Sequence, residues 1–295
     1  MIPYELVSYE PRDKDDYVRL LREAWGPGSM SRAEFDWWFE RNPAGSLMSV
    51  ARTNGRVVGV AAHSLYRAVL EGEEQLVSFS VHATTHASVR GRGVFQELER
   101  KHEREAQERG VACVLAFASA PTAPLFLGPL GWTEVARLRI WARPVLNRRP
   151  QPTLQQSVAK FEGRGDWARS WPNHLVRDAA YLNWRYVDSP RDYVNLQRDD
   201  GYAVVAHKLH KGRRIALVAD LVGSVRPLLK ECVRRVRRDT QLLFALPARG
   251  QRAAYAASGF VPTPMTLHFM GKALAGRFNT DPAAWRFTLG DTDFF

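Results

Sequence analysis

A basic, glycine-containing segment, Thr84 to Phe95, joins a strand-like run to a helix-like run and could bind an anion. It reads Thr-Thr-His-Ala-Ser-Val-Arg-Gly-Arg-Gly-Val-Phe. Gly91 and Gly93 would let the backbone approach a ligand closely, while the free N–H groups and the dipole of the following helix would favour negative charge. Arg90 and Arg92 add charges suited to phosphate. The spacing therefore predicts an anion-binding loop.

The strand-like run before this loop carries residues that could transfer a proton. Ser78, Ser80 and His82 alternate with three apolar residues, which predicts that they share one face of the strand. Because an imidazole titrates near neutral pH, His82 is the first candidate for a general base and His86 the second, with Ser80 as a residue that could hold a water molecule. A purely structural role for a histidine in a strand stays open.

The hydrophobic patterns around the loop predict strands and helices that would position it. In the first half we expect helices at 17–25, 32–41 and 95–109, and strands at 47–53, 57–66, 75–85 and 111–118. In the second half we expect strands at 193–198, 202–209, 214–222, 241–246 and 263–270, and helices at 225–238 and 250–257. The similar order of elements in the two halves indicates an internal duplication.

The loop and its surroundings resemble the acyl-CoA pyrophosphate loop of the GNAT acetyltransferase superfamily. In that family the loop has Arg or Gln, two further residues, Gly, one residue, and then Gly or Ala. Arg90 and Gly93 fit this spacing, and Phe95 stands in the last position. The helix and strand that follow also fit, as does Leu-Gly-Trp at 130–132, where many members have Leu-Gly-Phe. The resemblance covers residues 1–145.

This resemblance implies an α+β protein built from two tandem GNAT-like domains, each a mixed twisted sheet flanked by helices. We expect a first domain at 1–145 with an acyl-CoA site, a linker at 146–172, and a degenerate GNAT-like domain with a C-terminal tail at 173–295. The second domain is expected to lack the cofactor because the matching segment, 218–225, reads Val-Ala-Asp-Leu-Val-Gly-Ser-Val, with one glycine and an acidic residue.

The resemblance also implies roles for individual residues. Backbone groups of Ala83, Thr84 and Thr85 would bind the pantetheine arm, and a backbone N–H there would polarise the thioester carbonyl. The amine substrate must lose a proton, which is the role expected for His82. Leu127 stands where many members have a tyrosine that protonates the leaving thiolate, so no such acid is expected. The residues expected at the diphosphate are Arg90, Gly91, Arg92, Gly93, Val94 and Phe95.

The function implied is that of an acyl-CoA-dependent N-acyltransferase, with acetyl-CoA or another acyl-CoA as the donor. The acceptor would be the amine of a small molecule, an amino sugar or a natural product. Asp291 and Asp293 could bind its ammonium group, or could belong to a docked tail. Two alternatives stay open: a Fem-type transferase that uses aminoacyl-tRNA, and a non-catalytic acyl-CoA-binding module. The Arg-Gly-Arg-Gly run favours CoA over tRNA.

Composition limits the remaining possibilities. The chain has 295 residues with 45% hydrophobic content, enough for a sizeable core, and its net charge of +11 favours an anionic partner. Its two cysteines are too few for a disulfide framework or a cysteine zinc site, and we expect no metal. Without a signal-peptide or membrane-spanning pattern, a cytoplasmic protein with no membrane partner is expected. Nucleic acid is expected only in the tRNA alternative, and the oligomeric state is left open.

Overall fold

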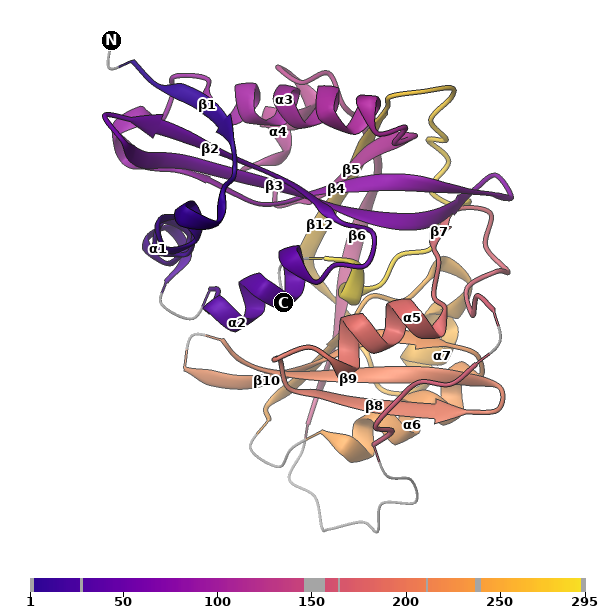
Figure 1. Ribbon diagram of the computed structural model, residues 1–295. Helices are drawn as coiled ribbons and strands as arrows, with labels where there is room; N and C mark the ends of the chain where they lie inside the picture. The colour runs from indigo at the N-terminus through magenta and orange to yellow at the C-terminus, as the bar shows by residue number, and fades with distance from the viewer. Residues whose placement is uncertain are drawn as a thin grey trace. The chain divides into compact units, whose positions relative to one another are not determined.

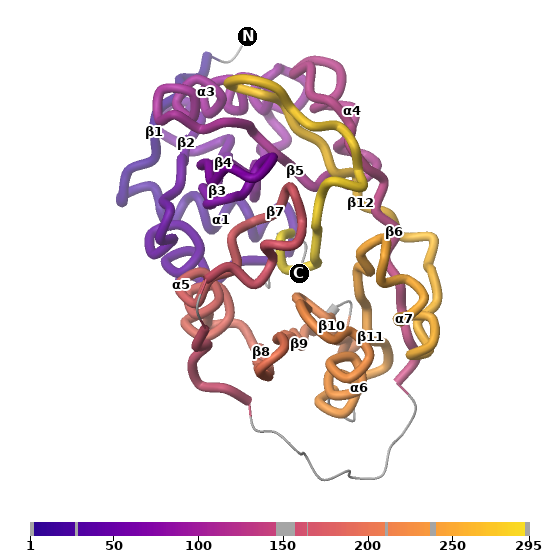
Figure 2. The backbone as a smooth tube through the Cα atoms, turned by 90° about the vertical axis from the view of Figure 1, so that its right-hand side faces the viewer, coloured from indigo at the N-terminus to yellow at the C-terminus, as the bar shows by residue number. Residues whose placement is uncertain are grey.

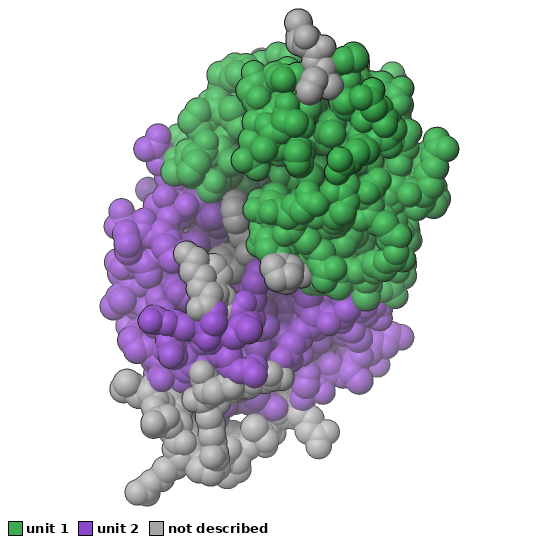
Figure 3. Space-filling view, turned by 90° about the vertical axis from the view of Figure 1, so that its left-hand side faces the viewer, with its two compact units in different colours: residues 1–68, 73–136, 268–280 green, residues 69–72, 137–267, 281–295 purple. Residues whose placement is uncertain are grey.

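The computed structural model describes residues 3–26, 29–145, 157–163, 165–210, 212–236 and 240–292. The chain forms two compact units, which Figure 3 shows in different colours. Unit 1 consists of residues 1–68, 73–136 and 268–280, and unit 2 of residues 69–72, 137–267 and 281–295. Each unit therefore takes residues from both halves of the chain.

Unit 1 is a mixed sheet in the strand order β1-β2-β3-β4-β5-β12. Strand β2 is antiparallel to β1 and β3, β4 is parallel to β5, and β5 is antiparallel to β12. Helices α1 and α2 cover one face of this sheet, and α3 and α4 cover the other (Figure 1). The elements are β1 (Glu5–Ser8), α1 (Lys14–Trp25), α2 (Arg32–Phe35), β2 (Ser46–Thr53), β3 (Arg56–Leu70), β4 (Glu73–Thr85), α3 (Val94–Glu108), β5 (Cys113–Ala118), α4 (Ala123–Leu127) and part of β12 (Val261–Ala273).

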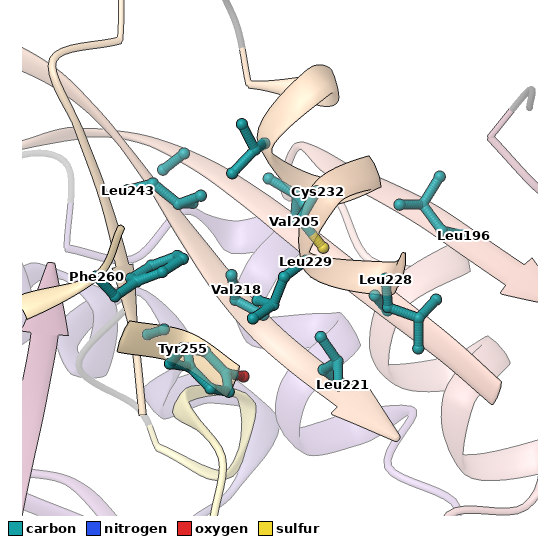
Figure 4. Close-up of a cluster of buried hydrophobic side chains, with 14 residues drawn as sticks. Leu196, Val205, Val218, Leu221, Leu228, Leu229, Cys232, Leu243, Tyr255 and Phe260 are labelled. Carbon is teal, nitrogen blue, oxygen red and sulfur yellow. The ribbon is translucent and has the colours of Figure 1, made fainter. Parts of the chain in front are cut away.

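Unit 2 repeats this arrangement in the order β8-β9-β10-β11-β6. Strand β9 is antiparallel to β8 and β10, β10 is parallel to β11, and β11 is antiparallel to β6. Side chains of α6, α7 and the strands form an apolar core that includes Leu229, Cys232, Tyr255 and Phe260 (Figure 4). The elements are β7 (His174–Leu175), α5 (Ala179–Leu182), β8 (Tyr193–Arg198), β9 (Gly201–His210), β10 (Arg213–Val222), α6 (Val225–Arg235), β11 (Leu242–Ala245), α7 (Arg252–Ala257) and part of β6 (Thr133–Pro144).

The last strand of each sheet comes from the other half of the chain. His268–Ala273 of β12 pair with Ala118–Cys113 of β5 (Figure 2), and Trp141–Pro144 of β6 pair with Ala245–Leu242 of β11. This exchange is why the units differ from the expected domains at 1–145 and 173–295. The expected domain boundary at the linker assumes that the strands of each half of the chain pair only with one another. An edge strand, however, can pair with any sheet that offers unpaired backbone groups.

The expected linker at 146–172 is only partly described, since residues 146–156 and 164 lie outside the described residues. The remainder packs into unit 2. Phe161 is buried, its ring centroid lies 5.6 Å from that of Tyr202, and its backbone N donates to Asn183 Oδ1 at 2.7 Å. Residues 157–163 and 165–172 are therefore part of a folded unit.

The predicted helices and strands are present with shifted ends. Residues 193–198 form a strand with the expected bounds, whereas the expected helix at 32–41 is the short helix α2 followed by a π-helical segment, Asp36–Glu40. In the part of the chain that the structure describes, no helix is both long and apolar enough to cross a membrane.

Candidate functional site

Strands β4 and β5 of unit 1 pair over a short stretch and then separate. Val77–Phe79 pair with Cys113–Leu115, whereas β4 continues to Thr85 and β5 continues to Ala118. Within the described residues, β5 pairs with no residue of β4 beyond Phe79. Because backbone N–H and C=O groups favour hydrogen-bonded partners, this half-buried end of β4, with Ala83, Thr84 and Thr85, is suited to an extended ligand that carries amide groups.

The loop after β4 leads directly into α3, a helix of 15 residues. Gly91 and Gly93 have φ of +73° and +81°, in the left-handed region that favours glycine. Gly93 is the N-cap and no side chain caps the first turn, so the N–H groups of Val94 and Phe95 have no intrahelical partner. A Cβ added at either glycine would meet nothing within 4 Å. The helix start is therefore an open, electropositive surface.

Exposed basic side chains surround this helix start. Arg90 donates from Nε to the backbone oxygen of Thr85 at 3.3 Å, and Arg92 is exposed. His86 is also exposed, and its Nδ1 accepts a hydrogen bond from the backbone N of Ser88 at 3.2 Å. Two guanidinium groups beside free N–H groups are the features that bind phosphate esters, so the geometry suits a diphosphate at this loop.

His82 lies in the stretch of β4 that does not pair with β5, and its backbone is left-handed, with φ +50°. Its side chain is buried among aromatic rings on the face covered by α1 and the π-helical segment. The ring centroids of Trp38, Phe39 and Trp25 lie 5.3, 5.8 and 6.1 Å from that of His82. Trp25 is half exposed, so it is the ring of this group that an incoming molecule can contact.

The expected shared face of Ser78, Ser80 and His82 is wrong. Ser78 and Ser80 point toward α3, where Ser80 Oγ donates to Glu99 Oε1 at 2.9 Å, whereas His82 lies on the opposite face of the sheet. The left-handed φ of His82 breaks the alternation that a regular strand would impose. Ser80 is buried, and its hydroxyl is bonded to Glu99 on the opposite face of the sheet from His82.

Comparison with known proteins agrees with this geometry. A family model described as an acetyltransferase (GNAT) domain matches residues 6–135, which span the separating strands and the loop. Residues 6–135 therefore form a GNAT acetyltransferase domain. No curated protein matches it in sequence.

The structural matches to solved proteins with the GNAT fold cover nearly the whole chain. N-myristoyltransferase from Saccharomyces cerevisiae with bound myristoyl-CoA is 11% identical with a TM-score of 0.65, and the match covers 92% of this chain and 83% of that chain. A tandem GNAT protein from the clavulanic acid biosynthesis pathway is 13% identical with a TM-score of 0.58, covering 94% and 100%. A probable N-acyltransferase from Enterococcus faecalis is 9% identical with a TM-score of 0.62, covering 93% and 73%. The expected fold class is confirmed.

In unit 2 the segment that would match the GNAT loop is closed by a buried ion-pair network. Asp220 accepts from Arg177 Nε at 2.9 Å and from the hydroxyl of Tyr202 at 3.0 Å. Burial acts to raise the pKa of Asp220, but Arg177 and Arg286 outweigh it and hold the pKa below its ordinary value. A buried carboxylate at this position would repel a diphosphate.

Asp291 does not serve as the expected acceptor-binding residue. Asp291 is buried and accepts from Arg177 Nη2 at 2.6 Å, and burial is the main influence that raises its pKa. Because it is paired inside unit 2, Asp291 is not available to an amine substrate. Asp293 lies outside the described residues.

Sequence reasoning did not identify two parts of this site. Glu99 of α3 is fully buried against β3 and β4, although its position in a polar helix is typical of a solvent-exposed residue. Trp25, Trp38 and Phe39 surround His82 from segments 43–57 residues earlier in the chain, a proximity that no local pattern indicates.

Proposed function

We propose that this GNAT protein is an N-acyltransferase that moves an acyl group from an acyl-CoA to the amine of a small molecule, an amino sugar or a natural product. The observation that carries the proposal is the start of α3, which follows Gly93 and has no side-chain cap, beside the end of β4 that does not pair with β5. A diphosphate would bind the N–H groups at Gly93 to Phe95 and the side chains of Arg90 and Arg92. The pantetheine amides would pair with the backbone of Ala83 to Thr85.

This arrangement supports direct transfer. The amine nitrogen attacks the thioester carbonyl carbon, the C–S bond breaks, and CoA leaves as a thiolate. A backbone N–H at the end of β4 would stabilise the oxyanion that forms on the way. Leu127 offers no acid, and a thiolate is a tolerable leaving group without one.

The position of His82 supports its role as the base that takes the amine proton, since an imidazole nitrogen can accept a proton. His82 lies in the stretch of β4 that separates from β5, at the only non-glycine residue of this strand with a positive φ among the described residues. Trp25, half exposed beside it, would give the acceptor an aromatic surface.

The direct test is release of CoA thiol from acetyl-CoA and longer acyl-CoAs across a panel of amines, with the acylated amine identified by mass spectrometry. We expect equal amounts of thiol and amide. Thermal shift with CoA but no turnover would identify a binding module instead. Amide formation that requires aminoacyl-tRNA and releases no thiol would identify the tRNA-dependent alternative.

Replacing His82 with Ala is expected to lower kcat on the order of tenfold, because water can partly replace the imidazole as the proton acceptor. The dependence of kcat on pH near neutrality should flatten, and the affinity for CoA should stay close to that of the wild type. Steady-state kinetics across pH and calorimetric CoA titration would measure these effects.

The matched control for that variant is His268→Ala, since His268 is also in unit 1, where its Nδ1 lies 2.5 Å from Glu134 Oε1. It should keep the wild-type pH profile. A His82→Ala protein with wild-type turnover and pH profile would show that His82 is structural.

A further inference from the structure

A cluster of buried polar side chains lies between α3 and the sheet of unit 1. It differs from the proposed acyl-CoA site in that its members are closed off from solvent. A ring nitrogen of each histidine and a carboxylate oxygen lie within 4.8 Å of one another. The three central residues are His63, Glu99 and His102, and the three serines around them are Ser49, Ser78 and Ser80.

Each histidine is held through one ring nitrogen by a serine from the sheet. Nδ1 of His63 lies 2.7 Å from Ser78 Oγ, and Nε2 of His102 lies 2.9 Å from Ser49 Oγ. When a ring nitrogen donates its proton to such a partner, the other nitrogen keeps a free electron pair. These contacts leave Nε2 of His63 and Nδ1 of His102 as the nitrogens for a further partner.

Glu99 is held in the same way. Its Oε1 accepts from Ser80 Oγ at 2.9 Å, while its Oε2 lies 2.9 Å from Nε2 of His63. One oxygen is therefore fixed by the sheet, and the other faces an imidazole nitrogen. A proton or another cation between these two atoms would be stabilising.

His102 supplies an independent observation. Its Nδ1 is buried and has no hydrogen-bond partner among the described residues. A buried nitrogen without a hydrogen-bond partner is costly, so this atom points to a ligand between the two histidines and Glu99.

We propose that His63, Glu99 and His102 bind a divalent transition metal ion, with Zn²⁺ as the first candidate. Two imidazoles and one carboxylate are a ligand set that Zn²⁺ takes in proteins, and ions such as Fe²⁺ also accept it. The three serines then act as the outer hydrogen-bond partners that orient metal ligands. The ion would join α3 to β3 and so stabilise the helix that begins at the anion-binding loop. This departs from the expectation of no metal.

The spacing of the ligands explains why the sequence does not show them as a metal motif. Glu99 and His102 are one helical turn apart, which places them on the same face of α3, whereas His63 comes from β3. His63 lies 36 residues before Glu99, so only tertiary packing brings this third ligand to the other two.

The test uses the full chain, purified without a metal-affinity tag. We expect about one bound metal ion per chain by mass spectrometric metal analysis, with the melting temperature falling after chelator dialysis and recovering on addition of Zn²⁺. Loading with Co²⁺ should give the intense visible absorption of a tetrahedral or five-coordinate site. None of these readouts depends on acyltransferase activity.

Three variants separate the ligands from their surroundings. His102→Gln should lose the bound metal. Ser49→Ala keeps all three ligands and removes one orienting partner, so its metal affinity should fall about 10–100-fold. His268→Gln is the control, because His268 also faces a glutamate in unit 1 but has no second histidine in its group. It should keep the full metal content.

Two results would overturn the proposal. In the first, the wild-type chain carries no metal, gives only the weak spectrum of hydrated Co²⁺, and does not change its melting temperature with Zn²⁺ or chelator. The cluster is then a hydrogen-bonded network in which His63 and Glu99 share a proton. In the second, His102→Gln folds and binds as much metal as the wild type, so the ion lies elsewhere.

Discussion

Replacing both Arg90 and Arg92 with Glu should weaken acyl-CoA binding about 100-fold or more while the chain stays folded. A hydrogen bond to a charged group contributes about 1.5–3 kcal/mol, and two such contacts to the diphosphate would be lost. Charge reversal adds repulsion to that loss. Both side chains are exposed, so the effect falls on the ligand rather than on the fold. Calorimetric titration with CoA would measure the affinity, and circular dichroism would check the fold.

The matched control carries the same change of charge at the middle and end of the same helix. Arg104 and Arg109 are exposed and lie about three and four turns from the loop. The double variant Arg104→Glu and Arg109→Glu should bind CoA with an affinity within a few-fold of the wild type. An equal loss in both double variants would mean that only the general positive charge of the protein attracts CoA. An unchanged CoA affinity in the Arg90→Glu and Arg92→Glu variant would show that the loop does not bind CoA.

Replacing Arg177 with Ala should lower the free energy of unfolding by about 3–5 kcal/mol. Arg177 is fully buried and bonds to both Asp220 and Asp291, at 2.9 and 2.6 Å. Its removal leaves two buried carboxylates with a single remaining guanidinium partner, Arg286. Urea unfolding at neutral pH, followed by a signal from unit 2, would measure the loss.

The pH dependence of that loss follows from the pKa of Asp220. Because its folded pKa lies below the ordinary value of 3.8, ionised Asp220 stabilises the wild type above that value, and this contribution is lost as the pH falls through the folded pKa. In the variant, protonation of Asp220 removes a buried charge that has lost its main partner. The difference between variant and wild type should therefore shrink as the pH falls toward 3.8.

The control for the buried network is an exposed ion pair in the same unit. Arg198 Nε lies 3.3 Å from Asp200 Oδ1, and both side chains are about half exposed. Arg198→Ala should change the free energy of unfolding by less than about 1 kcal/mol. A comparable decrease in the free energy of unfolding in both variants would show that the buried network around Arg177 stabilises unit 2 no more than an exposed ion pair does.

Local patterns in the chain are enough to predict most of the elements and the anion-binding loop. The strand at 193–198 follows from its local residue pattern, and the helix after Gly93 follows from apolar periodicity and from Gly93 and Gly110 at its ends. All of these signals depend only on neighbouring residues. The loop at Arg90 to Gly93 can also be predicted from neighbouring residues alone. Its basic residues, its glycines and the helix start are contiguous, so no distant contact is needed to bring them together.

Tertiary structure alone decides which distant segments meet. The exchange of β6 and β12 depends on backbone hydrogen bonds between paired residues about 100 apart for β6 and β11 and about 150–160 apart for β5 and β12. Such bonds carry no signal in the side-chain pattern. His82 leaves its expected face because one φ angle is left-handed, a choice that packing against α1 and the π-helical segment makes. Glu99 is buried because β3 and β4 offer it partners. The hydrophobic period and the residue spacing in a sequence describe one helix or strand at a time. Which face of that helix or strand is buried depends on the other elements that pack against it.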